Sequence, residues 1–161
     1  MTSPDIARVR RFARAVTAEV GALDSSFLGR GRPLGVARVL NAIGAGRSEI
    51  GAIRAYLGLD SGLMSRLLRS LEVEGLVVTA PHPTDARRRI ASLTAAGERE
   101  FEAYEALSNA RAALLLERTP HADELLRAMD RVALALGQHA ITVAEADPRG
   151  AAAGACLGAY Y

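Results

Sequence analysis

Apolar residues near the start of the chain recur in alternating steps of three and four. They are Ile6, Val9, Ala13, Val16, Val20, Leu23 and Phe27. This spacing predicts one helix through residue 27 with a narrow apolar face, and Ser3 followed by Pro4 is typical of a helix start. Such a face fits packing either against a helix of a second subunit or within a bundle of the same chain.

Glycine and proline between residues 29 and 33 end this helix. The apolar pattern then predicts three shorter helices, at 34–44, 49–57 and 60–75. Ser48 is expected to cap the second of these. Asp60 or Ser61 should cap the third, which Gly75 ends.

Beyond residue 75 the composition becomes β-type. Two runs, 76–80 and 89–93, predict an antiparallel hairpin around a loop at 81–85. Thr94 is expected to cap a long helix to about residue 118, and Thr119 with Pro120 should begin a sixth helix. The predicted fold class is therefore mainly α with a small β-hairpin wing: a winged helix-turn-helix flanked by long helices.

The helix predicted at 60–75 has two chemically different faces. Leu63, Leu67 and Leu71 are expected to face the core, with Leu68 nearer the rim. The outward face carries small polar residues and arginines, namely Ser61, Gly62, Ser65, Arg66 and Arg69. Small residues let a helix approach a major groove closely, and arginine offers a bidentate contact to guanine or phosphate. A solvated amphipathic surface is the alternative for this helix taken alone.

The net charge of +2 hides a gradient along the chain. Ten arginines and five acidic residues give residues 30–89 a charge of +5, whereas residues 90–161 carry six arginines and ten acidic residues. Three consecutive arginines, Arg87, Arg88 and Arg89, lie at or just past the hairpin tip, where like charges repel unless a polyanion neutralises them. An arginine placed there can enter a narrow minor groove. Helix and wing together favour binding of double-stranded DNA.

The stretch 58–97 resembles a MarR-type transcriptional regulator. It contains Asp85-x-Arg87 followed by Leu93-Thr94 and Gly97, which matches the spacing of that family's wing signature. The resemblance covers about residues 1–145. It implies a homodimer in which residues 1–29 and 94–146 form a helical dimerisation region around a DNA-binding domain at 30–93, with a tail at 147–161.

The same resemblance implies roles for single residues. Arg87 would enter the minor groove, Asp85 would brace the wing, and Ser65 with Arg66 would contact DNA from the helix. The chain departs from the family in having three consecutive wing arginines, so which of them enters the groove stays open.

A regulator of this type, repressor or activator with repression favoured, would act on a pseudo-palindromic operator. Many such regulators release DNA when a small aromatic effector binds between the dimer helices and the winged domain. Tyr104, Phe12 and Arg38 are conceivable contacts, although a plain core role is favoured for each.

Two other functions remain open. The tail from Ile141 to Tyr161 is similar to the junction where some MarR-type domains run into a GNAT acetyltransferase domain, so the chain would be the regulatory part of such an enzyme. Otherwise the tail is only a disordered end. A helical protein-interaction dimer without DNA function is the third hypothesis.

The sequence shows no pattern typical of a metal site, a disulfide or an active site. The three histidines, His82, His121 and His139, have no companion ligands at metal-binding spacing, and Cys156 alone forms no internal disulfide. No catalytic grouping or cofactor motif is present, which predicts a protein that is not an enzyme and has no cofactor. The longest apolar run is too short for a membrane span and the N-terminus is charged, so we expect a cytoplasmic protein without membrane contact.

Overall fold

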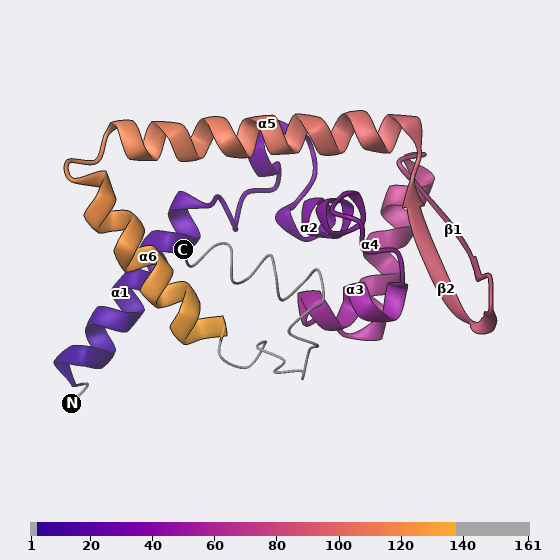
Figure 1. Ribbon diagram of the computed structural model, residues 1–161, viewed down its shortest axis with the longest axis horizontal. Coiled ribbons are helices and arrows are strands. Elements are labelled where there is room, and N and C mark those ends of the chain that lie inside the picture. Colours follow the sequence, from indigo (N-terminus) through magenta and orange to yellow (C-terminus); the bar gives the residue numbers. More distant parts are fainter. Residues whose placement is uncertain (1–2, 138–161) are drawn as a thin grey trace, which may run out of the picture. The chain divides into compact units, whose positions relative to one another are not determined.

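The computed structural model describes residues 3–137, apart from the side chain of Ala86, and is mainly helical with one antiparallel hairpin (Figure 1). This confirms the predicted fold class. The elements are α1 (Pro4–Glu19), the 3₁₀ turn η1 (Phe27–Gly29), α2 (Leu34–Gly44), α3 (Ile50–Leu57), α4 (Ser61–Val73), β1 (Val77–His82), β2 (Asp85–Leu93), α5 (Ala95–Glu117) and α6 (Ala122–Gly137). The chain divides into two compact units between Leu114 and Leu115. No helix in the described part of the chain has the length and apolar character needed to cross a membrane.

Helix α1 begins as predicted but ends early. The Ser3 side chain accepts a hydrogen bond from the Asp5 amide at 3.4 Å, and Pro4 occupies the first turn. The helix stops at Glu19 rather than near residue 27, because Gly21 adopts a left-handed conformation with φ of 64° that an α-helix cannot continue. Phe27 therefore belongs to the separate turn η1. None of the residues of α1 is buried within the chain.

The core lies among α2, α3, α4 and the start of the hairpin. Its largest fully buried side chains are Val39, Leu40, Ile53, Met64 and Leu71. Each such side chain contributes roughly 1.5–3 kcal/mol relative to an exposed one. These contacts fix α3 and α4 as a helix-turn-helix.

Helix α4 shows one predicted cap and one wrong prediction. Asp60 is the cap, and its carboxylate accepts a hydrogen bond from the Leu63 amide at 2.8 Å. Leu68 was expected near the rim but is only 6% exposed, whereas Leu63 and Leu67 are half-buried. The reason is that α4 packs against both α2 and β1, so its buried face is centred on Met64, Leu68 and Leu71.

Ser48 does not cap α3, contrary to the sequence-based expectation. Glu49 occupies the cap position without a side-chain capping bond. The Ser48 carbonyl instead accepts a hydrogen bond from the Ala91 amide at 2.8 Å, and Glu49 forms an isolated bridge with Ile90. The start of α3 is thus held by β2.

The hairpin strands are longer than predicted. The register pairs Val77 with Leu93 and continues to Pro81, with an irregularity before His82. Only residues 83–84 separate the strands, so the loop expected at 81–85 is largely strand. Arg87, Arg88 and Arg89 consequently lie within β2 and not in a free loop.

A close backbone contact joins the hairpin to α5. The Thr94 hydroxyl accepts a hydrogen bond from the Gly97 amide at 3.0 Å, which confirms the predicted cap, and donates to the Gly75 carbonyl at 2.7 Å. A Cβ atom on Gly97 would lie 2.0 Å from the Leu76 carbonyl oxygen. The first turn of α5 therefore touches the backbone that leads into β1.

Ionic contacts reinforce this junction. The Glu100 carboxylate on α5, 9% exposed, accepts hydrogen bonds from Arg30 Nε at 2.9 Å and from Arg32 Nη1 at 2.7 Å. Arg32 Nε also donates to Glu74 at the end of α4 at 2.6 Å. These bonds, chiefly the one from Arg30, hold the pKa of Glu100 below its ordinary value.

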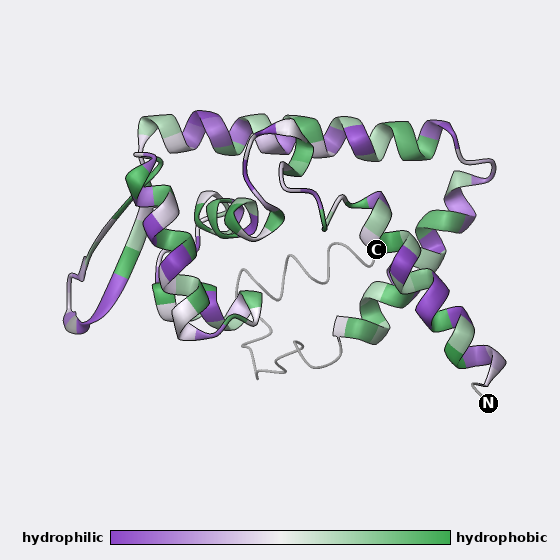
Figure 2. Cartoon of the chain, turned by 180° about the vertical axis from the view of Figure 1, so that it is seen from behind, coloured by the Kyte–Doolittle hydropathy of each residue, from purple (hydrophilic) through white to green (hydrophobic). Residues whose placement is uncertain are grey.

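Hydrophilic and hydrophobic bands alternate along α5 (Figure 2), and its buried residues, Gly97, Glu100 and Tyr104, lie in its first half. In the second unit, α6 begins at Ala122 rather than at Thr119 and Pro120. His121, with φ of 58°, precedes it and its carbonyl accepts from the Glu124 amide at 2.9 Å.

Replacing Gly97 with alanine should destabilise the fold, because the new methyl group would overlap the Leu76 carbonyl. We expect a loss of about 1–3 kcal/mol in the free energy of unfolding, measured by urea denaturation. Gly35→Ala is the matched control, since its Cβ would meet only Leu67 methyl groups at 3.7 and 3.8 Å. Equal stability of the two variants would contradict the close contact.

Candidate nucleic-acid interface

The outward face of α4 is open and chemically simple. All five residues predicted for it, Ser61, Gly62, Ser65, Arg66 and Arg69, are exposed. The Ser65 hydroxyl donates to the Ser61 carbonyl at 2.8 Å, so it lies close to the helix surface. The backbone amide of Leu63, above all, lowers the pKa of the capping Asp60. The helix start is therefore capped, and its outward side carries only the small residues Ser61 and Gly62.

Asp85 shapes the wing just after its turn. Its carboxylate accepts a hydrogen bond from the Arg87 amide at 3.0 Å. The Arg87 side chain is exposed and has no hydrogen-bond or ion-pair partner within residues 3–137. Asp85 thus orders the backbone that carries Arg87 while leaving its guanidinium available.

The other two wing arginines have partners inside the molecule. Arg88 donates through Nε to Glu49 Oε1 at 2.9 Å and through Nη2 to Glu49 Oε2, and this pairing raises the pKa of Arg88. Arg89 donates to the Thr79 hydroxyl on β1. Thr79 in turn donates to Glu72 Oε1 on α4 at 2.6 Å. The adjacent wing arginines therefore differ in their partners: Arg88 is paired with a carboxylate, whereas Arg89 bonds a neutral hydroxyl.

A groove of about 500 Å³ lies between α4, the start of α3 and the wing. Of the predicted site residues it brings together Ser65, Arg69 and the three wing arginines; Ser61, Gly62, Arg66 and Asp85 do not line it. It also includes Glu49, Glu72 and Thr79, which the sequence reasoning did not select. No local signal identifies Glu49, because its partner Arg88 is 39 positions away.

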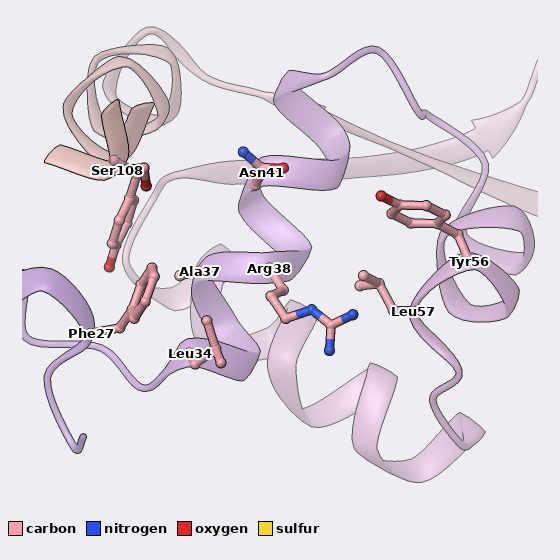
Figure 3. A pocket seen from close by; sticks show the side chains of 9 residues that line it. Phe27, Leu34, Ala37, Arg38, Asn41, Tyr56, Leu57 and Ser108 are labelled. Atoms are coloured by element: carbon pink, nitrogen blue, oxygen red, sulfur yellow. The ribbon is translucent and has the colours of Figure 1, made fainter. Parts of the chain in front are cut away.

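A second cavity, of about 200 Å³, lies beside α2 (Figure 3). Figure 3 shows Arg38 and Asn41 extending from α2 between Phe27 on one side and Tyr56 on the other. Tyr104 also lines this cavity, as Arg38 does, whereas Phe12 does not. Two of the three conceivable effector contacts are therefore neighbours.

Tyr104 is the polar residue buried most deeply in that cavity wall. Its ring stacks on Phe27 at a centroid distance of 5.9 Å. Its hydroxyl is buried, with the Arg32 guanidinium near it. Desolvation raises the pKa of Tyr104, and the interaction with Arg32 opposes that rise.

The predicted histidine and cysteine positions add little to these sites. The His82 ring contacts the Thr84 hydroxyl at 3.2 Å. His139, Cys156 and the tail at 147–161 lie outside the described residues. Within the part of the chain that is described, no three His, Cys, Asp or Glu side chains are grouped as metal ligands.

A known protein family matches part of this chain in sequence, and known structures are similar to it in fold. Residues 30–88 match the sequence model of the MarR family. No curated protein matches the chain in sequence. A MarR-family transcriptional regulator from Rhodococcus sp. RHA1 has a similar structure, with 20% identity, a TM-score of 0.68, and coverage of 83% of this chain and 95% of that one.

Two further structures contain ligands. FabT from Streptococcus pneumoniae, solved in complex with DNA, is 13% identical, with a TM-score of 0.68 over 85% of this chain and 99% of its own. CouR from Rhodococcus jostii RHA1, bound to p-coumaroyl-CoA, is 24% identical, with a TM-score of 0.67 over 89% and 97%. Residues 30–88, which contain the helix-turn-helix and most of the wing, thus carry the sequence pattern of the MarR family, and the chain has the winged helix-turn-helix fold of a MarR-family transcriptional regulator.

Proposed function

We propose that this protein is a repressor that binds double-stranded DNA sequence-specifically, as a homodimer on a pseudo-palindromic operator. The observation that carries the proposal is the groove in which the outward face of α4 meets the wing arginines. Small residues on α4 permit close approach to base edges, and its arginines can read guanine. The DNA complex of the structurally similar FabT supports the same use of the fold.

Within the wing, Arg87 is the arginine that enters the minor groove. Arg88 is held by Glu49 and Arg89 by Thr79, whereas Arg87 has no partner among the described residues. A guanidinium that is not already paired loses no internal contact when it meets the negative potential of a narrow groove. Asp85 contributes by fixing the backbone that carries it. On α4, Ser61, Gly62, Ser65, Arg66 and Arg69 form the major-groove contact surface.

The second subunit covers the apolar face of α1. Val9 and Phe12 are 66% and 48% exposed, and Ile6 and Val16 extend the same stripe. Helix α6 presents its own exposed apolar residues, Leu126, Met129, Leu134 and Leu136. Helices of this kind gain stability by packing against a partner. Residues 1–29 and 94–146 accordingly form the dimerisation region, and 30–93 the DNA-binding domain.

The cavity beside α2 binds a small aromatic acid that controls DNA binding. Phe27, Tyr56 and Tyr104 offer aromatic surface, and Arg38 offers a cation for a carboxylate. Tyr104 is the buried member of this aromatic set. The ligand complex of CouR supports small-molecule binding in this fold.

The acetyltransferase alternative gains no support, because the sequence match is to the MarR family and the structurally similar Rhodococcus sp. RHA1 protein is a transcriptional regulator. Residues 141–161 lie outside the described part of the chain. The helical interaction dimer without DNA function predicts a dimer that shifts no duplex.

Replacing Arg87 with alanine should weaken DNA binding about tenfold or more and reduce the salt slope by roughly 1 for each wing. The operator is first selected from a random duplex pool. Fluorescence anisotropy then measures affinity at several salt concentrations. The pool also reports symmetry, with half-site centres expected about one helical turn apart.

Arg99→Ala is the matched control for this test, since Arg99 is exposed on α5 and outside the groove. If wild-type protein selects no duplex, or binds without salt dependence, the proposed function is wrong. If Arg87→Ala binds as wild type does, the wing assignment is wrong.

A charge within the α1 stripe should dissociate the dimer. We expect Val9→Glu to lower the mass measured by light scattering from about twice the chain mass toward that of one chain, because the carboxylate would be buried unpaired. Ala7→Glu adds the same charge on the opposite side of α1 and should leave the dimer intact. A wild-type monomer at micromolar concentration would exclude this interface.

Benzoate should raise the Tm by about 2–5 °C at roughly ten times its Kd, whereas benzamide, which lacks the charge, should raise it less. Arg38→Gln is expected to remove this difference, and Arg54→Gln, exposed on α3 away from the cavity, to preserve it. Equal shifts for acid and amide with wild-type protein would overturn the assignment of Arg38.

A further inference from the structure

Glu49 is fixed at the edge of the DNA-facing groove. Its backbone begins α3 and bridges Ile90 on β2, while the neighbouring Ser48 carbonyl is bonded to Ala91. Its side chain lines the same groove as Ser65, Arg69 and Arg87. The position of this carboxylate is therefore set by the fold on the face where phosphates would arrive.

The contact of Glu49 with Arg88 has the geometry of phosphate recognition. Two nitrogens on one edge of the guanidinium, Nε and Nη2, donate to the two carboxylate oxygens. Arginine meets phosphate in the same two-bond arrangement. The Arg88 and Glu49 side chains are 48% and 30% exposed, and exposed ion pairs are weak enough to exchange partners.

Arg89 has a different type of partner from that of Arg88. It bonds the neutral Thr79 hydroxyl and reaches the Glu72 carboxylate only through that hydroxyl. Of the three wing arginines, Arg88 alone is paired directly with a carboxylate among the described residues. Glu49 thus cancels one specific wing charge.

We propose that Glu49 acts as an internal substitute for a DNA phosphate: it holds Arg88 in the free protein and releases it to the backbone when a duplex binds. Glu49 thereby sets the affinity and the salt dependence of binding. The inference rests on the proposed DNA-binding function. Its physical basis is that a paired arginine adds little to phosphate neutralisation until it leaves its partner, so the energy of the Arg88–Glu49 pair opposes DNA binding.

The test is the neutral, nearly isosteric variant Glu49→Gln. It should bind the selected operator about two- to fivefold more tightly per wing at low salt, and the salt slope should steepen by up to roughly 0.9 per wing. Glu102→Gln removes the same charge from an exposed position on α5 outside the groove and should change neither quantity appreciably. Urea denaturation of each variant checks that the fold is retained.

A double-mutant cycle with Arg88→Ala isolates the pair. In the Arg88→Ala background, Glu49→Gln should lose most of its effect on affinity and slope. An undiminished effect would mean that Glu49 acts by general repulsion, which overturns the exchange of partners. Weaker binding by Glu49→Gln alone would mean that the pair braces the wing, and would also overturn it. Both results presuppose wild-type binding, whose absence would instead refute the proposed function.

Discussion

The arrangement of the first unit depends on one nearly buried carboxylate. Glu100 on α5 accepts hydrogen bonds from Arg30 and Arg32, which lie in the segment before α2. Arg32 also donates a hydrogen bond to Glu74 at the end of α4. Two guanidinium groups packed against a helix would repel each other and lose hydration without it. With it, the entrance to α2, the exit from α4 and the first half of α5 are held together. A neutral residue in place of Glu100 would leave the positive charges of Arg30 and Arg32 uncompensated.

The same stretch of α5 serves both candidate sites. Tyr104 lies one turn after Glu100 and lines the cavity beside α2, and Gly97 lies about one turn before it, against the backbone that leads into the wing. A ligand at Tyr104 would therefore act on the helix that carries the junction. Occupancy of one site can affect the other through a short path of packed residues and ion pairs, provided that the ligand prefers one arrangement of this junction.

Local signals in the sequence predicted part of this structure well. The caps at Asp60 and Thr94, the end of α4 at Gly75 and the outward face of α4 depend on residues within one or two helical turns. The errors arise where distant segments meet. Leu68 is buried because β1 also covers α4, and Ser48 is diverted from capping because β2 passes beside it. The partners of Arg88 and Arg89 were unpredictable for the same reason, since pairing across 39 and 10 positions leaves no periodic trace.

The contact between Gly97 and the Leu76 carbonyl determines which positions can be substituted without disturbing the fold. Because the Leu76 backbone meets a residue without a side chain there, no larger residue fits unless α5 shifts relative to the start of the hairpin. The outward residues of α4 are exposed and contribute little to the core. Substitutions on that outward face can therefore alter the proposed contact surface while leaving unchanged the frame that presents it.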